Sequence, residues 1–309
     1  MRLEPVSALA RSLGCVCREQ APLAGCTSFK IGGPAALLVD APNPAALQRL
    51  LGCCREEEIP VLFLGNGSNV LAADSGFPGV VLRLAGGAPS IAGAADGGIL
   101  VNCPAGVPLK VLCRFVREAG LSGLEFAYGI PGAVGGAVYM NAGAYGGQMS
   151  DVLVSVEAVS ADGTSVREVP VSAMALGYRH SALMETGEIV LSVRVMLHPE
   201  DKAEIGARME DFMRRRREKQ PLEYPSAGSF FKRPAGHFAG ALIEQSGLKG
   251  FAVGGAQVSE KHAGFVINRG GATCADVRAL ADEVIRRVEA EHGVRLEPEV
   301  RFLPGAGGE

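Results

Sequence analysis

Several features that would mark a specialised class of protein are missing from this chain of 309 residues. No apolar run approaches the roughly 20 residues that a membrane-spanning helix needs. Glu4 and Arg11 interrupt the N-terminus before any apolar core of a secretory signal. The net charge of −3 gives no reason to expect a nucleic acid or an anionic membrane as a partner. We therefore expect a cytoplasmic protein without nucleic-acid or membrane partners. We also expect a monomer, although this does not follow from the missing features.

Motifs for metal ions and for the commonest nucleotide folds are missing as well. The eight cysteines include no Cys-x-x-Cys pair, and no histidine stands at a zinc-like spacing, so we predict buried reduced thiols and no metal site. No Gly-x-Gly-x-x-Gly follows an expected strand, and no Gly-x₄-Gly-Lys-Ser/Thr occurs. Any bound dinucleotide would then lie neither on a Rossmann fold nor on a P-loop.

The composition that remains is that of an ordinary globular protein, with 48% hydrophobic and 20% charged residues, and its length suits two or three domains. Apolar residues 36–39 and 61–64 predict two buried strands. Between them, Asn43 followed by Pro44 is typical of the start of a helix, which completes a βαβ unit. From about 80 to 198, alternating apolar residues predict mostly antiparallel sheet.

The pattern changes at His198-Pro199, where we place a domain boundary. Thr273 and Asp276 predict a capping box that opens a helix, and Gly293 is expected to end it. The basic run at 214–217 suits a solvated helix face near a C-terminus. The other expected elements are helices over 201–219 and 239–245 and strands over 263–268 and 294–302.

One stretch stands out because it is rich in glycine and yet apolar. Seven glycines fall from Gly129 to Gly147, with Ile130, Val134 and Val138 among them. A flexible linker would be polar, so this stretch is expected to be buried. Glycine lets the main chain touch a ligand without a Cβ in the way. A run of tight turns is the alternative, but the position between other unusual stretches favours a cofactor cradle.

Three further stretches could carry chemistry. Residues 65–69, Gly-Asn-Gly-Ser-Asn, follow an expected strand and could form either a hairpin turn or a cradle for a pyrophosphate. Residues 178–181, Tyr-Arg-His-Ser, stand between two expected strands. Ser229 follows a proline-bounded break, and Glu299 lies near the end of the last expected strand. Taken singly, Arg179, Ser229 and Glu299 could equally be an ion-pair residue, a turn residue and an exposed carboxylate.

Taken together, these stretches resemble the UDP-N-acetylenolpyruvoylglucosamine reductases, flavoenzymes of peptidoglycan precursor synthesis. The resemblance runs in order over about residues 26–303. Its motifs are Leu-Gly-Asn-Gly-Ser-Asn at 64–69, Gly-Ile-Pro-Gly-x-x-Gly-Gly at 129–136, Met-Asn-Ala-Gly-Ala-Tyr-Gly at 140–146, Tyr-Arg-x-Ser at 178–181, Ala-Gly-Ser-Phe-Phe-Lys at 227–232 and Glu-Pro-Glu-Val-Arg at 297–301.

The resemblance implies an α+β fold with a non-Rossmann FAD-binding domain of the vanillyl-alcohol-oxidase/PCMH type. Its two lobes would span residues 1–80 and 81–198, followed by an α+β substrate domain at 199–303 and a disordered tail at 304–309. FAD would be held without a covalent bond, with NADPH as the reductant and a UDP-sugar sharing the same cleft. The implied cofactor residues are Gly65, Asn66, Gly67, Ser68, Asn69, Ile130, Pro131, Gly135 and Gly136.

The resemblance also implies the chemistry. Hydride would pass from flavin N5 to the terminal carbon of an enol ether, and negative charge would build toward the adjoining carboxylate. Arg179 as a fixed cationic fork and Glu299 as a protonated donor would stabilise that state. Ser229 would protonate the adjacent carbon. Substrate-binding candidates are Lys219, Lys232 and His262.

One departure concerns a tyrosine that longer members of this family carry on an insertion after Tyr-Arg-x-Ser. Here Ser181 leads almost directly into the strand expected near 189–197, so the chain resembles the shorter subclass and no such tyrosine is assigned. Two rival functions remain open. One is an FAD-dependent oxidase of alcohols or hydroxy acids, although neither cofactor stretch holds a histidine for covalent attachment. The other is a non-catalytic sensor of nucleotide sugars.

Overall fold

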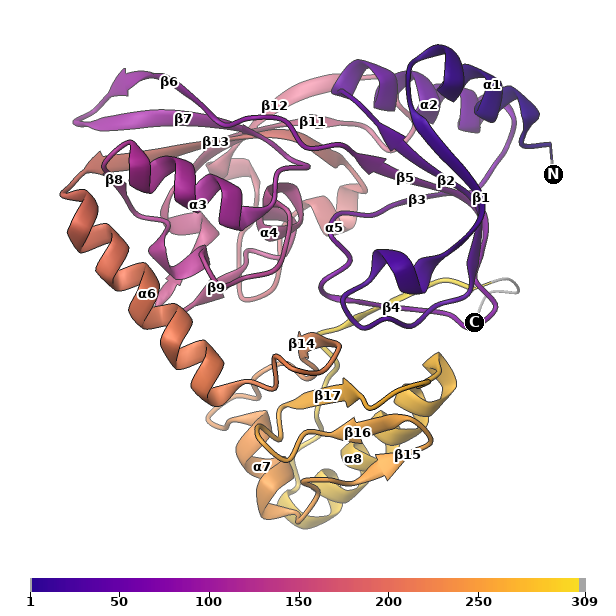
Figure 1. Cartoon of the computed structure of the whole chain (residues 1–309), viewed down its shortest axis with the longest axis vertical. Coiled ribbons are helices and arrows are strands. Elements are labelled where there is room, and N and C mark those ends of the chain that lie inside the picture. Colours follow the sequence, from indigo (N-terminus) through magenta and orange to yellow (C-terminus); the bar gives the residue numbers. More distant parts are fainter. Residues whose placement is uncertain (1, 306–309) are drawn as a thin grey trace. The chain divides into compact units, whose positions relative to one another are not determined.

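The computed structural model describes residues 2–305 of the chain (Figure 1). These residues divide into two compact units. The first unit takes in the chain up to residue 19 together with 37–66 and 79–216, and the second takes in 20–36, 67–78 and 217 onward. The boundaries expected at 80, 198 and 303 remain predictions. Residues 306–309 of the expected tail lie outside the described part.

A four-stranded sheet has the order β1-β2-β5-β3. The predicted βαβ unit is present as β2, α2 and β3, but β5 pairs in parallel with β3, between it and β2. Asn43 caps α2 as predicted, since its Oδ1 accepts a hydrogen bond of 2.9 Å from the backbone N–H of Ala46. The elements are α1 (Glu4–Ser12), β1 (Val16–Pro22), β2 (Pro34–Ala41), α2 (Pro44–Glu56), β3 (Val61–Phe63) and β5 (Phe77–Leu84).

The second sheet of the first unit is antiparallel throughout, as predicted for most of residues 80–198. Its order is β12-β11-β13-β7-β6, and β8 pairs with one end of β13. The strands are β6 (Ser90–Ala95), β7 (Gly98–Pro104), β8 (Leu121–Ser122), β11 (Leu153–Val159), β12 (Val166–Pro170) and β13 (Ile189–Pro199). Helices α3 (Leu109–Glu118) and α4 (Val134–Tyr139) lie together along this sheet, and α4 contacts β7 and β13 (Figure 1).

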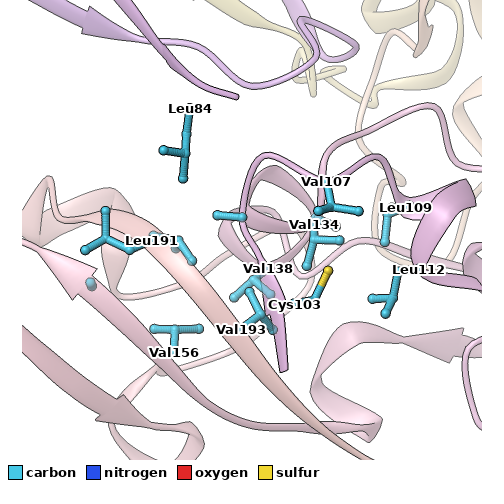
Figure 2. Packing of buried hydrophobic residues seen from close by; sticks show 14 of the residues in the cluster. Leu84, Cys103, Val107, Leu109, Leu112, Val134, Val138, Val156, Leu191 and Val193 are labelled. Carbon is cyan, nitrogen blue, oxygen red and sulfur yellow. The ribbon is translucent and has the colours of Figure 1, made fainter. Parts of the chain in front are cut away.

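The hydrophobic core of the first unit anchors the glycine-rich stretch. Val134 and Val138 of α4 are fully buried and lie among Cys103 of β7 and Val193 of β13, as Figure 2 shows. These two valines stand four residues apart, the spacing that places side chains on one face of a helix. Burying one valine contributes roughly 1.5–3 kcal/mol. A stretch with this many glycines therefore gains its fixed position from the apolar residues between them.

The second unit contains a four-stranded antiparallel sheet of order β14-β17-β16-β15, and α8 contacts β15, β16 and α7. The predicted capping box is present: Thr273 accepts from Asp276 N and Asp276 accepts from Thr273 N, each at 3.0 Å. Gly293 ends α8 with a φ of +66°. The elements are β14 (Ser226–Ser229), α7 (Ala239–Gln245), β15 (Ala252–Val253), β16 (Ala256–Val258), β17 (Phe265–Asn268) and α8 (Cys274–His292).

The prediction of one strand over 294–302 is wrong. Only β18 (Arg301–Leu303) is a strand there, and it pairs in parallel with β4 (Val70–Ala72). Before it, residues 297–299 make isolated backbone contacts with 230–232. These contacts amount to a single bridge, Phe231 to Pro298, flanked by hydrogen bonds from Glu299 N to Phe230 O and from Lys232 N to Glu297 O.

The expected helix over 201–219 is present as α6 (Lys202–Lys219). No helix within residues 2–305 is long and apolar enough to cross a membrane. All eight cysteines are free, and most are buried. Burial raises the pKa of the Cys54 and Cys103 thiols to about 12, so both are protonated at neutral pH.

Candidate active site

The glycine-rich segment, residues 129–147, begins beside α3 and runs through α4 into a small hairpin of β9 (Gly143–Ala144) and β10 (Gly147–Gln148). Ile130 is half-buried and Pro131 is exposed at its start. Backbone hydrogen bonds of 2.9 Å, from Val134 N to Val107 O and from Gly135 N to Ala105 O, fasten the start of α4 to the loop before α3. These bonds therefore fix the position of the segment relative to the rest of the first unit.

Gly135 and Gly136 are neighbours in α4 with different reasons to be glycine. A Cβ on Gly135 would lie 2.7 Å from the Cβ of Ala105, so close packing requires glycine there. A Cβ on Gly136 would meet no atom within 4 Å, and the residue is exposed. Glycine inside a helix costs about 1 kcal/mol relative to alanine, and packing within the unit does not explain that cost at Gly136. A surface kept free of side chains suits the close approach of a flat ring system, so the segment fits a flavin.

The loop at 65–69 reaches the same segment through its first residue. A Cβ on Gly65 would lie 3.7 Å from the Cβ of Ala133, the residue just before α4. The loop is not a hairpin turn, because β3 pairs with β5 and not with the strand that follows the loop. Asn66 is exposed. Two of the glycine motifs, some 65 residues apart in sequence, thus lie in near contact.

The later residues of this loop belong to the second unit and have local partners. Gly67 has a φ of +61°, and a Cβ there would lie 2.1 Å from Cys26 O, so only glycine fits. Its carbonyl accepts a hydrogen bond of 3.0 Å from Ser28 N. Asn69 Nδ2 donates to Glu299 O at 3.2 Å. Gly67 and Asn69 therefore also shape the second unit, and Ser68 between them is half-buried.

Arg179 lies in a tight turn that is hydrogen-bonded to the glycine-rich segment. Its φ is +54°, a conformation that is uncommon for a residue with a side chain. Its Nη2 donates to Gly143 O at 3.4 Å, and its guanidinium lies 5.1 Å from the centre of the Tyr178 ring. Ser181 Oγ donates to Tyr139 O at 2.7 Å. The stretch at 178–181 and the glycine-rich segment therefore meet in the first unit.

Arg216 is a residue that sequence reasoning missed. The basic run at 214–217 was expected to be a solvated face, but Arg216 is half-buried, and a Cβ on Gly129 would lie 3.0 Å from its Cδ. Burial lowers the pKa of its guanidinium below its usual range, and the group is still charged at neutral pH. Its spacing from Ile205, Met209 and Phe212 on the inner face of α6 is the helical signal that could have found it.

Ser229 lies at the end of β14 in the second unit, and a β-bulge sets its direction. The pairing of β14 with β17 shifts register between Ser226 and Ser229, and Gly228 inside the shift has a φ of +80°. Bulges of this kind often re-aim a side chain beside an active site. Ser229 pairs with Phe265 and is itself exposed. Its hydroxyl is therefore accessible while its backbone is held by the sheet.

Glu299 lies one backbone hydrogen bond from the Ser229 strand, because Glu299 N donates to Phe230 O at 2.8 Å. In the same way Lys232 N donates to Glu297 O at 2.8 Å, and the Lys232 ammonium lies 3.2 Å from the Glu297 carboxylate. Phe230 is almost fully buried beneath this pair of segments. The structure thus brings Ser229, Lys232 and Glu299 together on one small backbone framework.

His262 is half-buried in the turn before β17. Its Nδ1 accepts a hydrogen bond of 3.1 Å from Gly264 N, and its ring meets that of Phe265 edge to face with centres 5.0 Å apart. Burial lowers the pKa of His262, and the positive charges of Lys249 and Lys219 lower it further, while Glu244 opposes them. His262 is therefore neutral at pH 7. Lys219, exposed at the end of α6, shares this positive neighbourhood.

Comparison with known proteins agrees with this geometry. Residues 35–168 match the family described as the FAD binding domain, and residues 220–303 match the C-terminal domain of UDP-N-acetylenolpyruvoylglucosamine reductase. The chain is therefore an FAD-dependent oxidoreductase with the predicted α+β fold, a non-Rossmann FAD-binding domain of the vanillyl-alcohol-oxidase/PCMH type and an α+β C-terminal domain.

Whole-chain relatives identify the family within that class. The UDP-N-acetylenolpyruvoylglucosamine reductase of Syntrophomonas wolfei is 48% identical over 91% of this chain and 93% of its own length. That of Agathobacter rectalis is 46% identical over 92% and 93%. The crystal structure of the Thermus caldophilus reductase superimposes with a TM-score of 0.76 at 39% identity, over 94% of this chain and 99% of that one. This chain belongs to the UDP-N-acetylenolpyruvoylglucosamine reductase family, and FAD is its cofactor.

Proposed function

We propose that this chain reduces UDP-N-acetylglucosamine enolpyruvate to UDP-N-acetylmuramate, with NADPH as the reductant, in the synthesis of peptidoglycan precursors. Family membership and the FAD-binding match support the proposal. We further propose that the protein is a monomer in the cytoplasm, without nucleic-acid or membrane partners. In the net reaction, the C=C bond of the enol ether gains a hydride at its terminal carbon and a proton at the adjacent carbon, and NADPH becomes NADP⁺.

FAD would be held without a covalent bond. The loop of Gly65, Asn66, Gly67, Ser68 and Asn69 is proposed for the pyrophosphate, where backbone N–H groups and small polar side chains suit an anion. Ile130, Pro131, Gly135 and Gly136 are proposed to lie against the ring system. The open face above Gly136 supports this assignment. When bound, FAD supplies the carrier that accepts a hydride from NADPH and delivers it to the substrate.

Arg179 and Glu299 would act on the carboxylate next to the reacting double bond. Negative charge builds there as the hydride arrives, and a guanidinium matches a carboxylate with two parallel hydrogen bonds. Glu299 in its protonated form would donate a further bond. The observation that carries the proposal is that the Arg179 turn is hydrogen-bonded to the same glycine-rich segment whose Gly136 leaves an open surface.

Ser229 would give the proton to the adjacent carbon. A serine hydroxyl is a weak acid in water, so its direction must be fixed and its neighbours must assist it. The bulge at Gly228 and the pairing with Phe265 fix its backbone. Lys219 and Lys232 are proposed to bind the pyrophosphate of the substrate. His262 is a weaker candidate for the substrate side, because its Nδ1 already accepts a backbone hydrogen bond.

The test is an absorbance spectrum of the purified protein, followed by anaerobic titration with NADPH and then with the enolpyruvyl UDP-sugar. We expect a flavin spectrum that bleaches with one equivalent of NADPH and returns with one equivalent of the sugar. Return of colour only with oxygen would favour an oxidase. Colour that stays with the protein through acid precipitation would show covalent flavin. Binding of the sugar without any bleaching by NADPH would favour a sensor.

A further inference from the structure

Asn141 is a buried asparagine of the glycine-rich segment, with only 2% of its surface exposed. Its Nδ2 donates to Gly177 O at 3.0 Å and approaches Gln148 Oε1 at 3.4 Å, while its Oδ1 accepts from Ser150 N at 2.9 Å. These bonds fix the orientation of the amide. Its φ of +40° lies in the left-handed region, which asparagine enters more readily than most residues. One of its donors is thereby directed at the carbonyl two residues before Arg179.

The turn that carries Arg179 is closed by its own backbone and tied at both ends. Gly177 and His180 exchange two backbone hydrogen bonds, of 3.1 and 3.3 Å, around Tyr178 and Arg179. At the first end, Gly177 O accepts from Asn141. At the second end, the buried Ser181 donates its hydroxyl to Tyr139 O at 2.7 Å. The two tethers reach residues 139 and 141, two positions apart at the end of α4.

We propose that Asn141 is a positioning residue for Arg179, with Ser181 as its counterpart at the other end of the turn. The inference rests on the proposed role of Arg179 in the reduction. The Asn141 amide fixes the Gly177 end of the turn. Arg179, which has the left-handed φ in this turn, carries a long and flexible side chain whose direction depends on the turn. A guanidinium that must meet a carboxylate along two parallel hydrogen bonds tolerates little misplacement. Asn141 acts through Arg179 and is not itself assigned a contact with substrate or cofactor.

A purely structural role is the competing explanation, because a buried amide that satisfies backbone groups stabilises any fold. The two explanations differ in whether the effect of replacing Asn141 depends on the presence of Arg179. If Asn141 only stabilises the unit, its replacement has the same effect whether or not Arg179 is present. If it positions Arg179, its effect on the reaction disappears once Arg179 is gone, as expected for residues that act as a unit.

The experiment is a double-mutant cycle on the two half-reactions, measured by anaerobic stopped flow. Asn141→Asp keeps the shape and the acceptor for Ser150 N but replaces the donor to Gly177 O with an oxygen. We expect flavin reduction by NADPH to change less than about threefold, and reoxidation by the enolpyruvyl UDP-sugar to slow about 10- to 100-fold. Asn141→Asp added to Arg179→Ala should slow reoxidation by less than about twofold beyond Arg179→Ala alone.

Asn268 offers a matched control in the second unit. It is 7% exposed, its Nδ2 donates to Phe29 O at 3.1 Å, and its Oδ1 accepts from Gly270 N at 2.9 Å. Asn268→Asp therefore removes the same kind of buried donor. We expect it to lower the unfolding temperature much as Asn141→Asp does. Any effect that it has on reoxidation should persist in full in the Arg179→Ala background.

A readout independent of turnover is amide hydrogen exchange in the protein without FAD. Exchange in a peptide covering residues 175–182 should accelerate in Asn141→Asp and stay at the wild-type rate in Asn268→Asp. If Asn141→Asp does not fold, Ser181→Ala takes its place in both measurements, since it releases the other end of the same turn.

Equal slowing of both half-reactions by Asn141→Asp, or an equal effect of this change with and without Arg179, would overturn the inference. So would unchanged exchange at residues 175–182. Failure of the proposed function has a different signature. In that case the sugar would not reoxidise the reduced wild-type flavin at all. If only the role of Arg179 failed, Arg179→Ala alone would leave reoxidation at the wild-type rate, whatever the substitutions at 141 do.

Discussion

The Arg179 turn of the first unit and the Ser229 segment of the second unit place the two side chains proposed for catalysis by different means. Arg179 stands in a turn whose ends are fixed by buried side chains, the Asn141 amide and the Ser181 hydroxyl. Ser229 is placed by backbone alone, through a bulge at Gly228 and strand pairing with Phe265. Substitutions of the residues that hold the Arg179 turn can therefore change the direction of the Arg179 side chain. The position of the Ser229 hydroxyl, in contrast, depends on the backbone of its own segment.

The largest effect is expected from Ser229→Ala, which removes the proposed proton donor and leaves the backbone in place. Flavin reduction by NADPH should stay near the wild-type rate, while reoxidation by the UDP-sugar should fall about 10²- to 10⁴-fold, the contribution of a positioned general acid. Anaerobic stopped flow measures both rates. Reoxidation at the normal rate would remove Ser229 from the chemistry.

A somewhat smaller effect is expected from Arg179→Ala, because the loss of one charge-stabilising group typically costs about 10²- to 10³-fold. Reoxidation should slow far more than reduction. Arg179→Lys keeps the charge but not the planar fork, so it should recover only part of the rate. If both half-reactions slowed equally in Arg179→Ala, Arg179 would contribute to ligand binding in general and not to the reduction of the sugar. The comparison with Ser229 would then no longer concern two catalytic groups.

Gly135 and Gly136 offer a third test with neighbouring residues. Gly136→Leu should leave the unfolding free energy of the FAD-free protein equal or up to about 1 kcal/mol higher, since leucine favours a helix. It should weaken FAD binding at least about tenfold, because the side chain would occupy the open surface. Gly135→Ala should instead cost about 1–3 kcal/mol of stability, because of its clash with Ala105.

Chemical denaturation of the FAD-free protein and titration of FAD followed by flavin fluorescence measure the two quantities. The assignment of the flavin surface fails if Gly136→Leu binds FAD as tightly as the wild type.

The smallest expected effect is on the dependence of stability on pH, and it comes from His262 in the second unit. Burial, aided by Lys249 and Lys219, lowers its pKa below the usual 6.5. The unfolded chain therefore binds a proton at a higher pH than the folded one, and the stabilisation from a neutral His262 is present above pH 6.5. It is lost as the pH falls from 6.5 toward the lower folded pKa. His262→Gln should flatten this part of the stability curve, as denaturation at several pH values would show. An unchanged slope would contradict the assignment.

Local signals in the sequence were enough to predict the ends of several helices. Asn43 with Pro44, and Thr273 with Asp276, act through atoms within a few residues of one another, so the structure confirms them. The strand over 294–302 failed because pairing depends on partners far away in the chain. β18 finds its partner in residues 70–72, whereas residues 297–299 contact 230–232 through a single bridge.

The candidate site follows the same rule. Motifs singled out residues 65, 136, 179 and 229, because glycine runs and clustered polar residues are visible in any sequence. No pattern could indicate that Asn141 and Ser181 tie down the Arg179 turn, since those bonds join residues 36 and 42 positions apart. Arg216 was misjudged because a basic run near a helix end is usually solvated, and its place on the inner face outweighs that tendency.

The parallel pairing of β4 with β18 has a consequence for synthesis on the ribosome. The second unit draws on residues 20–36 and 67–78 as well as on those after 217, and its strand at 70–72 waits for residues 301–303. During translation, the strand at 70–72 must remain without this partner while more than 200 further residues emerge, which exposes a strand edge to other chains. Newly made protein therefore exposes this strand edge until residues 301–303 are available to pair with it.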